Sequence, residues 1–350
     1  MPKLTNLKLE RDLTQEFYST LKEKASSIEI QTLKLDHIEC PTPASSHHLA
    51  EAVSSMPNLT DLTLYAGDFN EDFYSTLTAK ASSIQVQTLQ IERIHCPTPA
   101  SSHHLAEALC SMPNLTNLSL SGEDLTEDLC YTLKANASSI QVQNFQLARI
   151  KCPTPASSHH FAEALCSMPN LTYLTLLGGD LNEELCYTLK AKASSLQVQS
   201  LELDGLLCPT PASSQHLAEA MCSMPNLTDL ELYGGDLTED FNSTLKAMAS
   251  SIQGCFPQIR KGNFRFNEQA QDDLDSFLQT LTCSESLHES DGSNDSDNSA
   301  DLDSSSDSYV SADLDGSSDS YVSADLDSSN DLDGSAHSGK SHDFQLCSVV

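Results

Sequence analysis

The chain contains no tryptophan, few aromatic residues and few basic ones. Its 350 residues include 18 Lys and Arg against 50 Asp and Glu, which gives a net charge of −32 at pH 7. A protein this acidic lacks the clustered positive charge that phosphate backbones require, so we expect no nucleic-acid partner. It has no apolar run long enough to span a bilayer, and no charged segment followed by an apolar one at its start. These absences predict a protein with no membrane segment and no secretory signal, located in the cytoplasm.

Motifs that build common catalytic sites are also missing. The sequence has no G-x-x-x-x-G-K-[ST] phosphate loop, no G-x-S-x-G nucleophile turn and no H-E-x-x-H zinc helix. The paired histidines, for example His103-His104, cannot share one ion because adjacent helical residues point about 100° apart. A metal ladder between successive pairs would need added Cys or carboxylate ligands. We therefore expect a non-enzymatic protein with no catalytic residue, no metal and no cofactor.

What the sequence does contain is an internal repeat. Met-Pro recurs at Met56, Met112, Met168 and Met224, so a spacing of 56 residues is kept three times. Each unit splits into two halves of 28 residues. A half opens with L-x-x-L-x-L, which alternates like a strand, and continues with apolar residues three and four apart, as on one helix face. Each half is therefore predicted to form a strand, a turn, a helix and a turn.

Residues that favour helix starts stand where this prediction needs them. In the second half Thr98 is suited to cap a helix that begins at Pro99, where a missing N–H costs nothing. In the first half the cap is Asn or Thr followed by an acidic residue, which suits the positive end of the helix dipole. These first-half caps are Asn70, Thr126, Asn182 and Thr238.

A single half cannot bury its apolar face alone, but stacked halves share one core and pair their strands at ~4.8 Å in a parallel sheet. The fold class is therefore α/β. The L-x-x-L-x-L halves resemble the leucine-rich repeat of the ribonuclease-inhibitor type, over residues 1 to about 282. The resemblance implies a horseshoe-shaped solenoid with parallel strands inside and helices outside. Gly67 and Ile94 stand where that repeat often has Asn, so we expect no ladder of Asn side chains.

The chain divides into three parts. Residues 1–251 hold nine regular repeats, and residues 252–283 hold a degenerate repeat that we interpret as the C-terminal cap. Residues 284–350 contain 16 acidic residues against one Lys, a charge of −15, and repeat SSDSYVSADLD at 305–315 and 317–327. This acidic tail has too little apolar surface to offset the entropy of ordering, so we expect it to be disordered.

The last four residues, Cys347-Ser348-Val349-Val350, fit the S/T-x-Φ pattern with a free carboxylate that adds a strand to a PDZ groove. Ser348 and Val350 are therefore candidate contacts for a PDZ domain. Three loosely defined positions also match by chance, and that explanation stays open.

Cysteines recur at equivalent positions in successive units. We call each stacked half a coil. Equivalent cysteines lie two coils apart, roughly 9–10 Å, which exceeds the ~7 Å limit on the Cα separation of a disulfide. We therefore expect them to be reduced, small residues of the core. The two sets are Cys40, Cys96, Cys152 and Cys208, and Cys110, Cys166 and Cys222.

The copies differ from one another mainly at the strand positions between the leucines. The second-half helix changes little, from PTPASSHHLAEAL to PTPASSQHLAEAM, on its solvent side as well as its buried side. Strand residues between the leucines project from the concave face of a curved sheet, where variation and aromatic residues suit a recognition surface. Relaxed drift after recent duplication is the alternative explanation. The candidate ligand-binding residues are Lys8, Asp61, Thr63, Tyr65, Glu92, Asn117, Ser121, Tyr173, Thr175, Glu202, Asp204, Asp229, Glu231 and Tyr233.

The paired units, with the consensus segments MPNLTxLxL, TLKAKASSIQVQ and CPTPASSHHLAEALCS, resemble the leucine-rich arrays of NOD-like receptors, the NACHT-domain receptors, in the expanded sets of marine invertebrates. The resemblance implies the sensor and autoinhibitory region of a cytosolic innate immune receptor. Such a region binds a protein or microbial ligand and restrains a NACHT ATPase in the same polypeptide. Met1 is in phase with the repeats and no polar cap precedes it, so we expect a fragment that lacks the NACHT domain.

Two other functions stay open on the sequence. The first is a stand-alone scaffold or inhibitor whose acidic tail binds basic proteins such as histones. The second is an array that activates small GTPases, since those proteins also combine such repeats with an acidic tail. The gene sequence upstream of Met1 would separate these from the receptor, because a NACHT domain there carries a phosphate-binding loop.

Overall fold

The computed structural model describes residues 5–11, 13–93, 96–122, 125–236, 241, 243–244, 247 and 258–261, with the backbone only at 150, 232–236 and 258–261. All of these lie in the first of two compact units, residues 1–287. The acidic tail, with Ser348 and Val350, and most of the predicted cap lie outside the described residues.

Within the described ranges the chain forms ten strands, and each pairs with the next in one parallel sheet. The strands are β1 Asn6–Glu10, β2 Thr32–Asp36, β3 Asp61–Tyr65, β4 Thr88–Glu92, β5 Asn117–Ser121, β6 Asn144–Ile150, β7 Tyr173–Asp180, β8 Ser200–Leu207, β9 Asp229–Asp236 and β10 Gln258–Lys261. The helices are α1 Gln15–Lys24, α2 Pro43–Ser55, α3 Glu71–Lys80, α4 Pro99–Ser111, α5 Glu127–Asn136, α6 Pro155–Ser167, α7 Glu183–Lys192 and α8 Pro211–Cys222.

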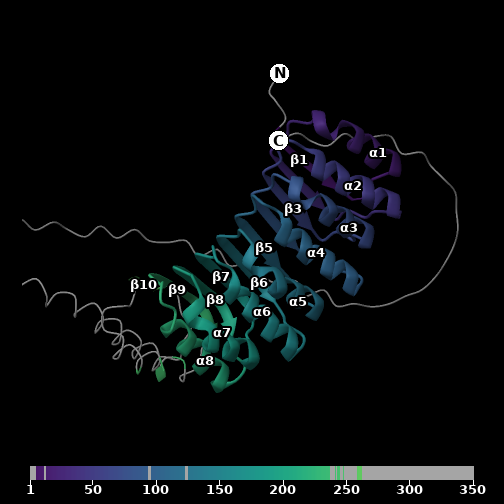
Figure 1. Cartoon of the computed structure of the whole chain (residues 1–350). Coiled ribbons are helices and arrows are strands. Elements are labelled where there is room, and N and C mark those ends of the chain that lie inside the picture. Colours follow the sequence, from purple (N-terminus) through teal and green to yellow (C-terminus); the bar gives the residue numbers. More distant parts are fainter. Residues whose placement is uncertain are drawn as a thin grey trace, which may run out of the picture. The chain divides into compact units, whose positions relative to one another are not determined.

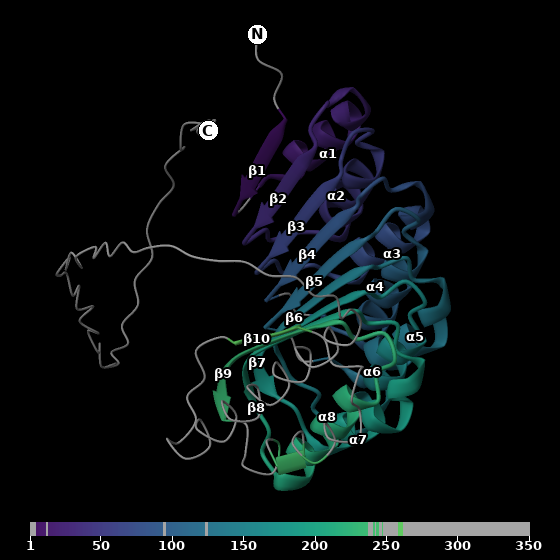
Figure 2. The same ribbon diagram turned by 90° about the vertical axis from the view of Figure 1, so that its left-hand side faces the viewer.

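The helices cover one face of the sheet and leave the other face open (Figures 1 and 2). We call the open face the strand face; it is the face that the sequence predicts to be concave. Along β3, Leu62 and Leu64 point toward the helices and are buried. Asp61, Thr63 and Tyr65 alternate with them, lie on the strand face and are half-buried. A single apolar core runs from Leu9 to Phe241. The α/β leucine-rich-repeat solenoid predicted from the sequence is therefore confirmed.

The predicted helix caps are present wherever the structure describes them. Asn182 Oδ1 accepts a hydrogen bond from the Leu185 N–H at 2.9 Å, and Thr98 Oγ1 accepts one from the Ser101 N–H at 3.0 Å. The coils alternate in type. In the coils of β1 to β8, odd coils, named by their strands, end their helix in a short 3₁₀ turn of sequence ASS, and even coils begin theirs with a proline at the first helical position. Thr238 lies outside the described residues.

The turns that lack the usual Asn are held by the backbone. From β1 to β8, the residue after each x-L-x-L-x strand pattern adopts a positive φ, for example 52° at Arg93 and 47° at Ala66. Its N–H then donates to a carbonyl of the next coil, at 2.9 Å from Arg93 to Ser121 and 2.7 Å from Ala66 to Glu92. The sheet's hydrogen-bond ladder thus continues into the turn, and the turn needs no side-chain amide.

The cysteines that the structure describes are all free thiols. Cys130 and Cys186 take the helix position held by Tyr18 and Tyr74 in the first two odd coils, and all four are fully or almost fully buried. Burial raises the pKa of Cys110 and of Cys166 to about 12. Because the thiolate is the reactive form, such thiols react slowly.

We accordingly expect Cys110 and Cys166 to react with iodoacetamide at pH 8 at least about a hundredfold more slowly in the folded protein than in urea, where the pKa returns to about 8.5. Peptide mapping by mass spectrometry after timed quenching measures both rates. Equal rates in the two conditions would show that these thiols are open to solvent.

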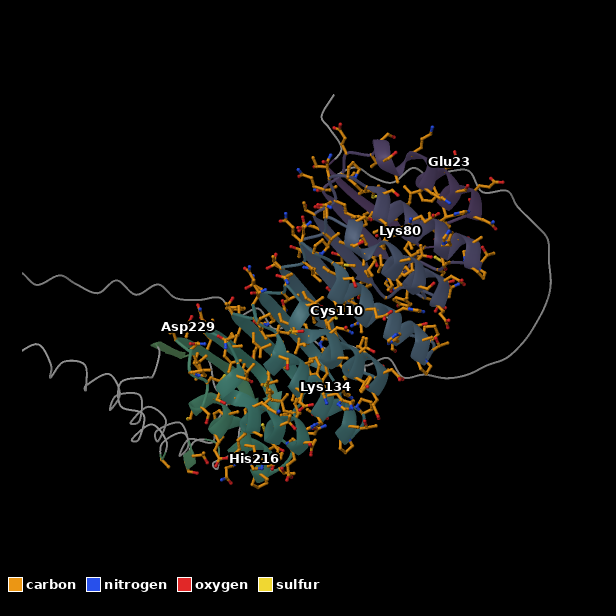
Figure 3. The ribbon with its side chains drawn as sticks, in the orientation of Figure 1. Glu23, Lys80, Cys110, Lys134, His216 and Asp229 are labelled. Carbon is orange, nitrogen blue, oxygen red and sulfur yellow. The ribbon has the colours of Figure 1, made fainter. Side chains whose placement is uncertain are left out.

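Adjacent helices are braced by a repeated set of polar contacts on the side away from the strands, where Lys134 is marked in Figure 3. Lys134 of α5 pairs with Glu163 of α6, and His159 of α6 lies 3.4 Å from the same carboxylate and 3.0 Å from Thr188 Oγ1 of α7. The Lys134 ammonium, aided by His159 and Lys192, holds the pKa of Glu163 below its usual value. The equivalent of Lys134 in α3 is Thr78, whose hydroxyl bonds the His104 carbonyl instead, at 2.6 Å.

Replacing Lys134 by Thr should lower the free energy of unfolding by less than about 1 kcal/mol at pH 7, because the pair is partly exposed. The folded pKa of Glu163 lies below the unfolded value of 4.5. The ion pair therefore contributes its full stabilisation above pH 4.5, and this stabilisation is lost as the pH falls through the folded pKa of Glu163. Urea unfolding at pH 7 and pH 3 should show the difference between wild type and Lys134→Thr shrinking in acid. A difference that persists at pH 3 would assign it to packing of the lysine stem.

Candidate protein-recognition surface

The strand face consists of three columns of side chains, because residues opposite one another on neighbouring strands are in register. The first column is Asn6, Thr32, Asp61, Thr88, Asn117, Asn144, Tyr173, Ser200 and Asp229. The second is Lys8, Lys34, Thr63, Gln90, Ser119, Gln146, Thr175, Glu202 and Glu231. The third is Glu10, Asp36, Tyr65, Glu92, Ser121, Ala148, Leu177, Asp204 and Tyr233.

Every residue that the sequence analysis singled out for ligand binding occupies one of these columns. The side chain of Tyr233 lies outside the described residues, so only its strand position is known. Thr175 offers little surface, since it is 5% exposed. The other predicted residues are exposed or half-buried, and they divide into three regions of different charge.

The N-terminal region gathers two lysines and a histidine around one carboxylate. Asp36 lies 2.8 Å from Lys8, 3.8 Å from Lys34 and 2.7 Å from His37. Burial acts to raise the pKa of Asp36, but the hydrogen bonds from Lys8 and His37 outweigh it and the pKa lies below its usual value. The same contact with Asp36, together with Glu10, raises the pKa of Lys8 to about 12.

Tyr65 stands at the centre of this region and is held by cations. Lys34 Nζ lies 5.2 Å and Arg93 Cζ 5.9 Å from the centre of its ring, and the His37 ring meets it edge-on at 5.3 Å. Such cation–π contacts attract the cations to the ring face. The sequence predicted exposed aromatics on this face, whereas Tyr65 is half-buried because side chains of the neighbouring coils cover its ring.

Apart from Glu92 at the end of β4, the middle of the strand face is uncharged and shallow. A hollow of about 180 Å³ lies over β4 to β7, with Gln90, Asn117, Ser119 and Gln146 among its lining residues. The hollow forms where small side chains such as Ser119 leave space, and the amide side chains that line it make its floor polar. Asn117 Oδ1 accepts a hydrogen bond from Asn144 Nδ2 at 2.5 Å.

The C-terminal region is acidic. Glu202 accepts hydrogen bonds from Tyr173 Oη at 3.0 Å and from Thr175 Oγ1 at 3.2 Å, which explains why Thr175 is covered. Burial, followed by the nearby carboxylate of Glu202, raises the pKa of Tyr173. Asp204 and Glu231 continue the negative charge on the neighbouring strand positions. The second column thus runs from lysines through neutral residues to glutamates.

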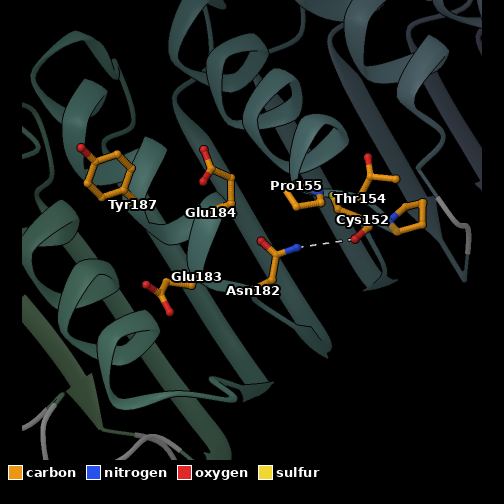
Figure 4. A pocket seen from close by; sticks show the side chains of 8 residues that line it. Cys152, Thr154, Pro155, Asn182, Glu183, Glu184 and Tyr187 are labelled. Atoms are coloured by element: carbon orange, nitrogen blue, oxygen red, sulfur yellow. Dashed lines mark hydrogen bonds between the residues drawn. The ribbon is translucent and has the colours of Figure 1, made fainter.

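A larger pocket of about 490 Å³ opens at the beginnings of α6 and α7 (Figure 4). One of its polar groups, the Asn182 amide, is already engaged: it donates to Ser158 Oγ at 2.6 Å and to the Cys152 carbonyl at 3.5 Å, besides capping α7. Glu183 and Glu184 flank the pocket. Among the residues that the structure describes, no three His, Cys, Asp or Glu side chains are placed to hold a metal ion.

Sequence reasoning missed one row of residues. Positive φ occurs directly after the x-L-x-L-x pattern of β1, β2, β4 and β6 at Arg11, His37, Arg93 and Arg149, the last of which lies inside the longer strand β6, and all four are exposed. We call these four residues the cationic rim. A signal was available in the sequence, since 37, 93 and 149 are separated by 56 residues, and Gly205 follows at the same spacing.

These features define a leucine-rich-repeat solenoid with a charge-graded strand face, and no family model matches its sequence. NACHT, LRR and PYD domains-containing protein 5 of Bos taurus is 30% identical to it over 198 residues, 54% of this chain and 17% of that protein. NACHT, LRR and PYD domains-containing proteins 12 and 13 of Homo sapiens are 27% and 28% identical, over 55% and 56% of this chain and 18% and 19% of their own lengths.

The chain therefore spans less than a fifth of the length of these relatives. The similarity supports the relationship to NOD-like receptors that the sequence of the repeats predicts. The marine-invertebrate subtype and the missing NACHT domain stay predictions. Within the described ranges, no helix combines the length and the apolar character needed to cross a bilayer.

Proposed function

We propose that this chain is a non-enzymatic protein-recognition module of a cytoplasmic innate immune receptor, which senses its ligand on the concave strand face. The observation that supports the proposal most is the contrast between the two faces of the sheet. Leu62, Leu118 and Leu174 repeat with little change beneath the sheet, while the outward residues between them differ from coil to coil. A rigid scaffold with variable outward side chains suits selection for a protein surface.

The proposal has two finer parts. By analogy with the NACHT domain in the relatives' names, the array restrains a NACHT ATPase in the same polypeptide. Separately, Ser348 and Val350 dock on a PDZ domain. Adding the purified chain to the NACHT domain of its own longer gene product should slow ATP hydrolysis, and an unchanged rate would remove the first part. If a Val350→Asp variant still bound every PDZ domain that the wild type binds, the second part would be wrong.

Partner capture tests the strand face. The variant Gln90→Arg, Ser119→Arg, Gln146→Arg places three charges across the neutral middle of that face. Its control, Ala79→Arg, Ala135→Arg, Ala191→Arg, places the same charges at exposed positions on the helices α3, α5 and α7. Proteins retained by the wild type from cell extract should be lost with the first variant and kept with the second. Retention by both variants, or loss with the helix variant alone, would contradict the assignment.

A second candidate function is favoured by the acidic C-terminal region. Glu202 and Glu231 on neighbouring strands present two carboxylates that suit a basic protein. Binding of a histone or of a Lys-rich peptide should then weaken in Glu202→Gln, Glu231→Gln and be unaffected by loss of residues 284–350. If binding depended on residues 284–350 alone, the result would instead support a scaffold whose acidic tail binds basic proteins.

A further inference from the structure

We propose that the cationic rim binds an extended acidic polypeptide segment whose carboxylates recur every third residue. This inference names the chemistry of one partner of the strand face and in that sense rests on the proposed function. It is tested with a defined peptide, so its failure is distinguishable from failure of partner capture.

The first argument is the concentration of arginine. The sequence holds five arginines, and Arg11, Arg93 and Arg149 occupy the same structural position, the positive-φ residue after the x-L-x-L-x pattern of their strands. Within the described residues none of these three guanidinium groups makes an ion pair with a carboxylate. In a chain of net charge −32, cations left without a carboxylate partner are available to an acidic ligand.

The second argument is the backbone. All rim residues have φ between 51° and 61°, a conformation that disfavours residues with a Cβ and suits glycine. The next coils use glycine at this position, at Gly178 and Gly205. Strained non-glycine residues of this kind cluster at functional sites, where the side chain is required in spite of the strain.

The third argument is the support given to the arginine stems. A Cβ at Gly122 would lie 3.3 Å from Arg93 Cγ, and one at Gly178 would lie 3.7 Å from Arg149 Cγ. The arginine stem thus lies against the glycine of the next coil in both cases, and at Gly122 a Cβ would press on it, whereas at Gly178 a Cβ would make ordinary van der Waals contact. Arg93 is further held at the Tyr65 ring, 5.9 Å from its centre. The side chains are therefore partly ordered before any ligand binds, which lowers the entropy cost of binding.

The spacing selects the ligand. His37, Arg93 and Arg149 occupy equivalent positions in the alternate coils of β2, β4 and β6, and neighbouring strands are ~4.8 Å apart, so these residues recur at roughly 10 Å. An extended peptide rises about 3.3 Å per residue, so every third residue meets the next rim residue. Nucleic acid is disfavoured because duplex DNA carries a charge every ~1.7 Å, far more than the three spaced arginines of the rim neutralise. The carboxylates Glu10, Asp36 and Glu92 also lie in this area, directly before Arg11, His37 and Arg93, and they disfavour ligands whose negative charges are contiguous.

The test is a titration of the full chain with a labelled 13-residue peptide that has Asp at every third position and Ser or Gly between. One comparison peptide has its Asp residues contiguous, and another has Asn in their place. The protein variants are Arg93→Gly with Arg149→Gly, Arg93→Lys with Arg149→Lys, and Gly205→Arg. Because the acidic tail is common to all variants, differences between them report on the rim. A matched control, Lys24→Asn with Lys80→Asn, removes the same charge from the helix side, with Asn as in the equivalent Asn136.

We expect the spaced peptide to bind, and its affinity to fall at least about tenfold in the double Gly variant, which keeps the fold because glycine suits the positive φ. The double Lys variant should lose roughly threefold, since it keeps the charge without the planar fork. Gly205→Arg should gain roughly threefold by extending the row, and the helix-side control should be unchanged. Absence of binding, equal binding of the contiguous or Asn peptide, full binding by the double Gly variant, or an equal loss in the control would overturn the proposal.

Discussion

Replacing Phe73 by Ala should lower the free energy of unfolding by about 4 kcal/mol, the largest stability effect we expect from a single change in this protein. The Phe73 side chain is fully buried, its ring stacks on Phe69 with centroids 4.4 Å apart, and it meets Tyr74 edge-on at 5.5 Å. Removing it leaves a cavity in a core that is shared by neighbouring coils. Urea or thermal unfolding followed by circular dichroism measures the loss.

The repeat itself supplies the control. Leu129 and Leu185 stand at the position of Phe73 in the next two odd coils and are likewise buried. Phe73→Leu should therefore cost less than about 1.5 kcal/mol, as volume-conserving changes do. If Phe73→Ala were as mild as Phe73→Leu, the α3 coil would not be packed as described.

Replacing Gly67 by Ala should cost about 2 kcal/mol, the second largest effect, through overpacking rather than a cavity. A Cβ at Gly67 would lie 2.3 Å and 2.6 Å from atoms of the Phe69 ring. That ring cannot move aside because Phe73 and Tyr74 enclose it. The same unfolding measurement applies.

A double-mutant cycle tests the mechanism of this second effect. Leu125 and Leu181 replace Phe69 in later odd coils, and the sequence carries Glu123 at the position of Gly67 in one of them. The Gly67→Ala penalty should therefore largely vanish in a Phe69→Leu background. An equal penalty in both backgrounds would place the strain in the backbone and not in the ring contact.

The two faces of the solenoid carry their residues under different constraints. Beneath the sheet, a change at one position is felt by the coils on both sides, because close packing leaves no spare volume. On the strand face a side chain meets only a few side chains of its own and the adjacent coils, such as Tyr173 and Glu202 across one strand boundary. Coil-to-coil differences there are tolerated by the fold, which is why that face is suited to recognition.

The sequence by itself determined the repeat, the strand and helix order, the register and the caps. These follow from local rules: leucine alternation places Leu62 and Leu64 on one side, and a Thr-Pro pair starts a helix at Pro99 wherever the chain carries it. Because each coil repeats the same pattern, the parallel pairing of consecutive coils followed as well.

The tertiary structure alone decided how the surface residues combine. Tyr65 proved to be half-buried among Lys34, His37 and Arg93, which come from three other strands or turns. The placement of Arg93 and Arg149 in one exposed row depends on a left-handed turn that a backbone ladder holds between coils. Such contacts join residues 27 or more positions apart along the chain, and they arise only when stacking brings neighbouring coils within ~4.8 Å.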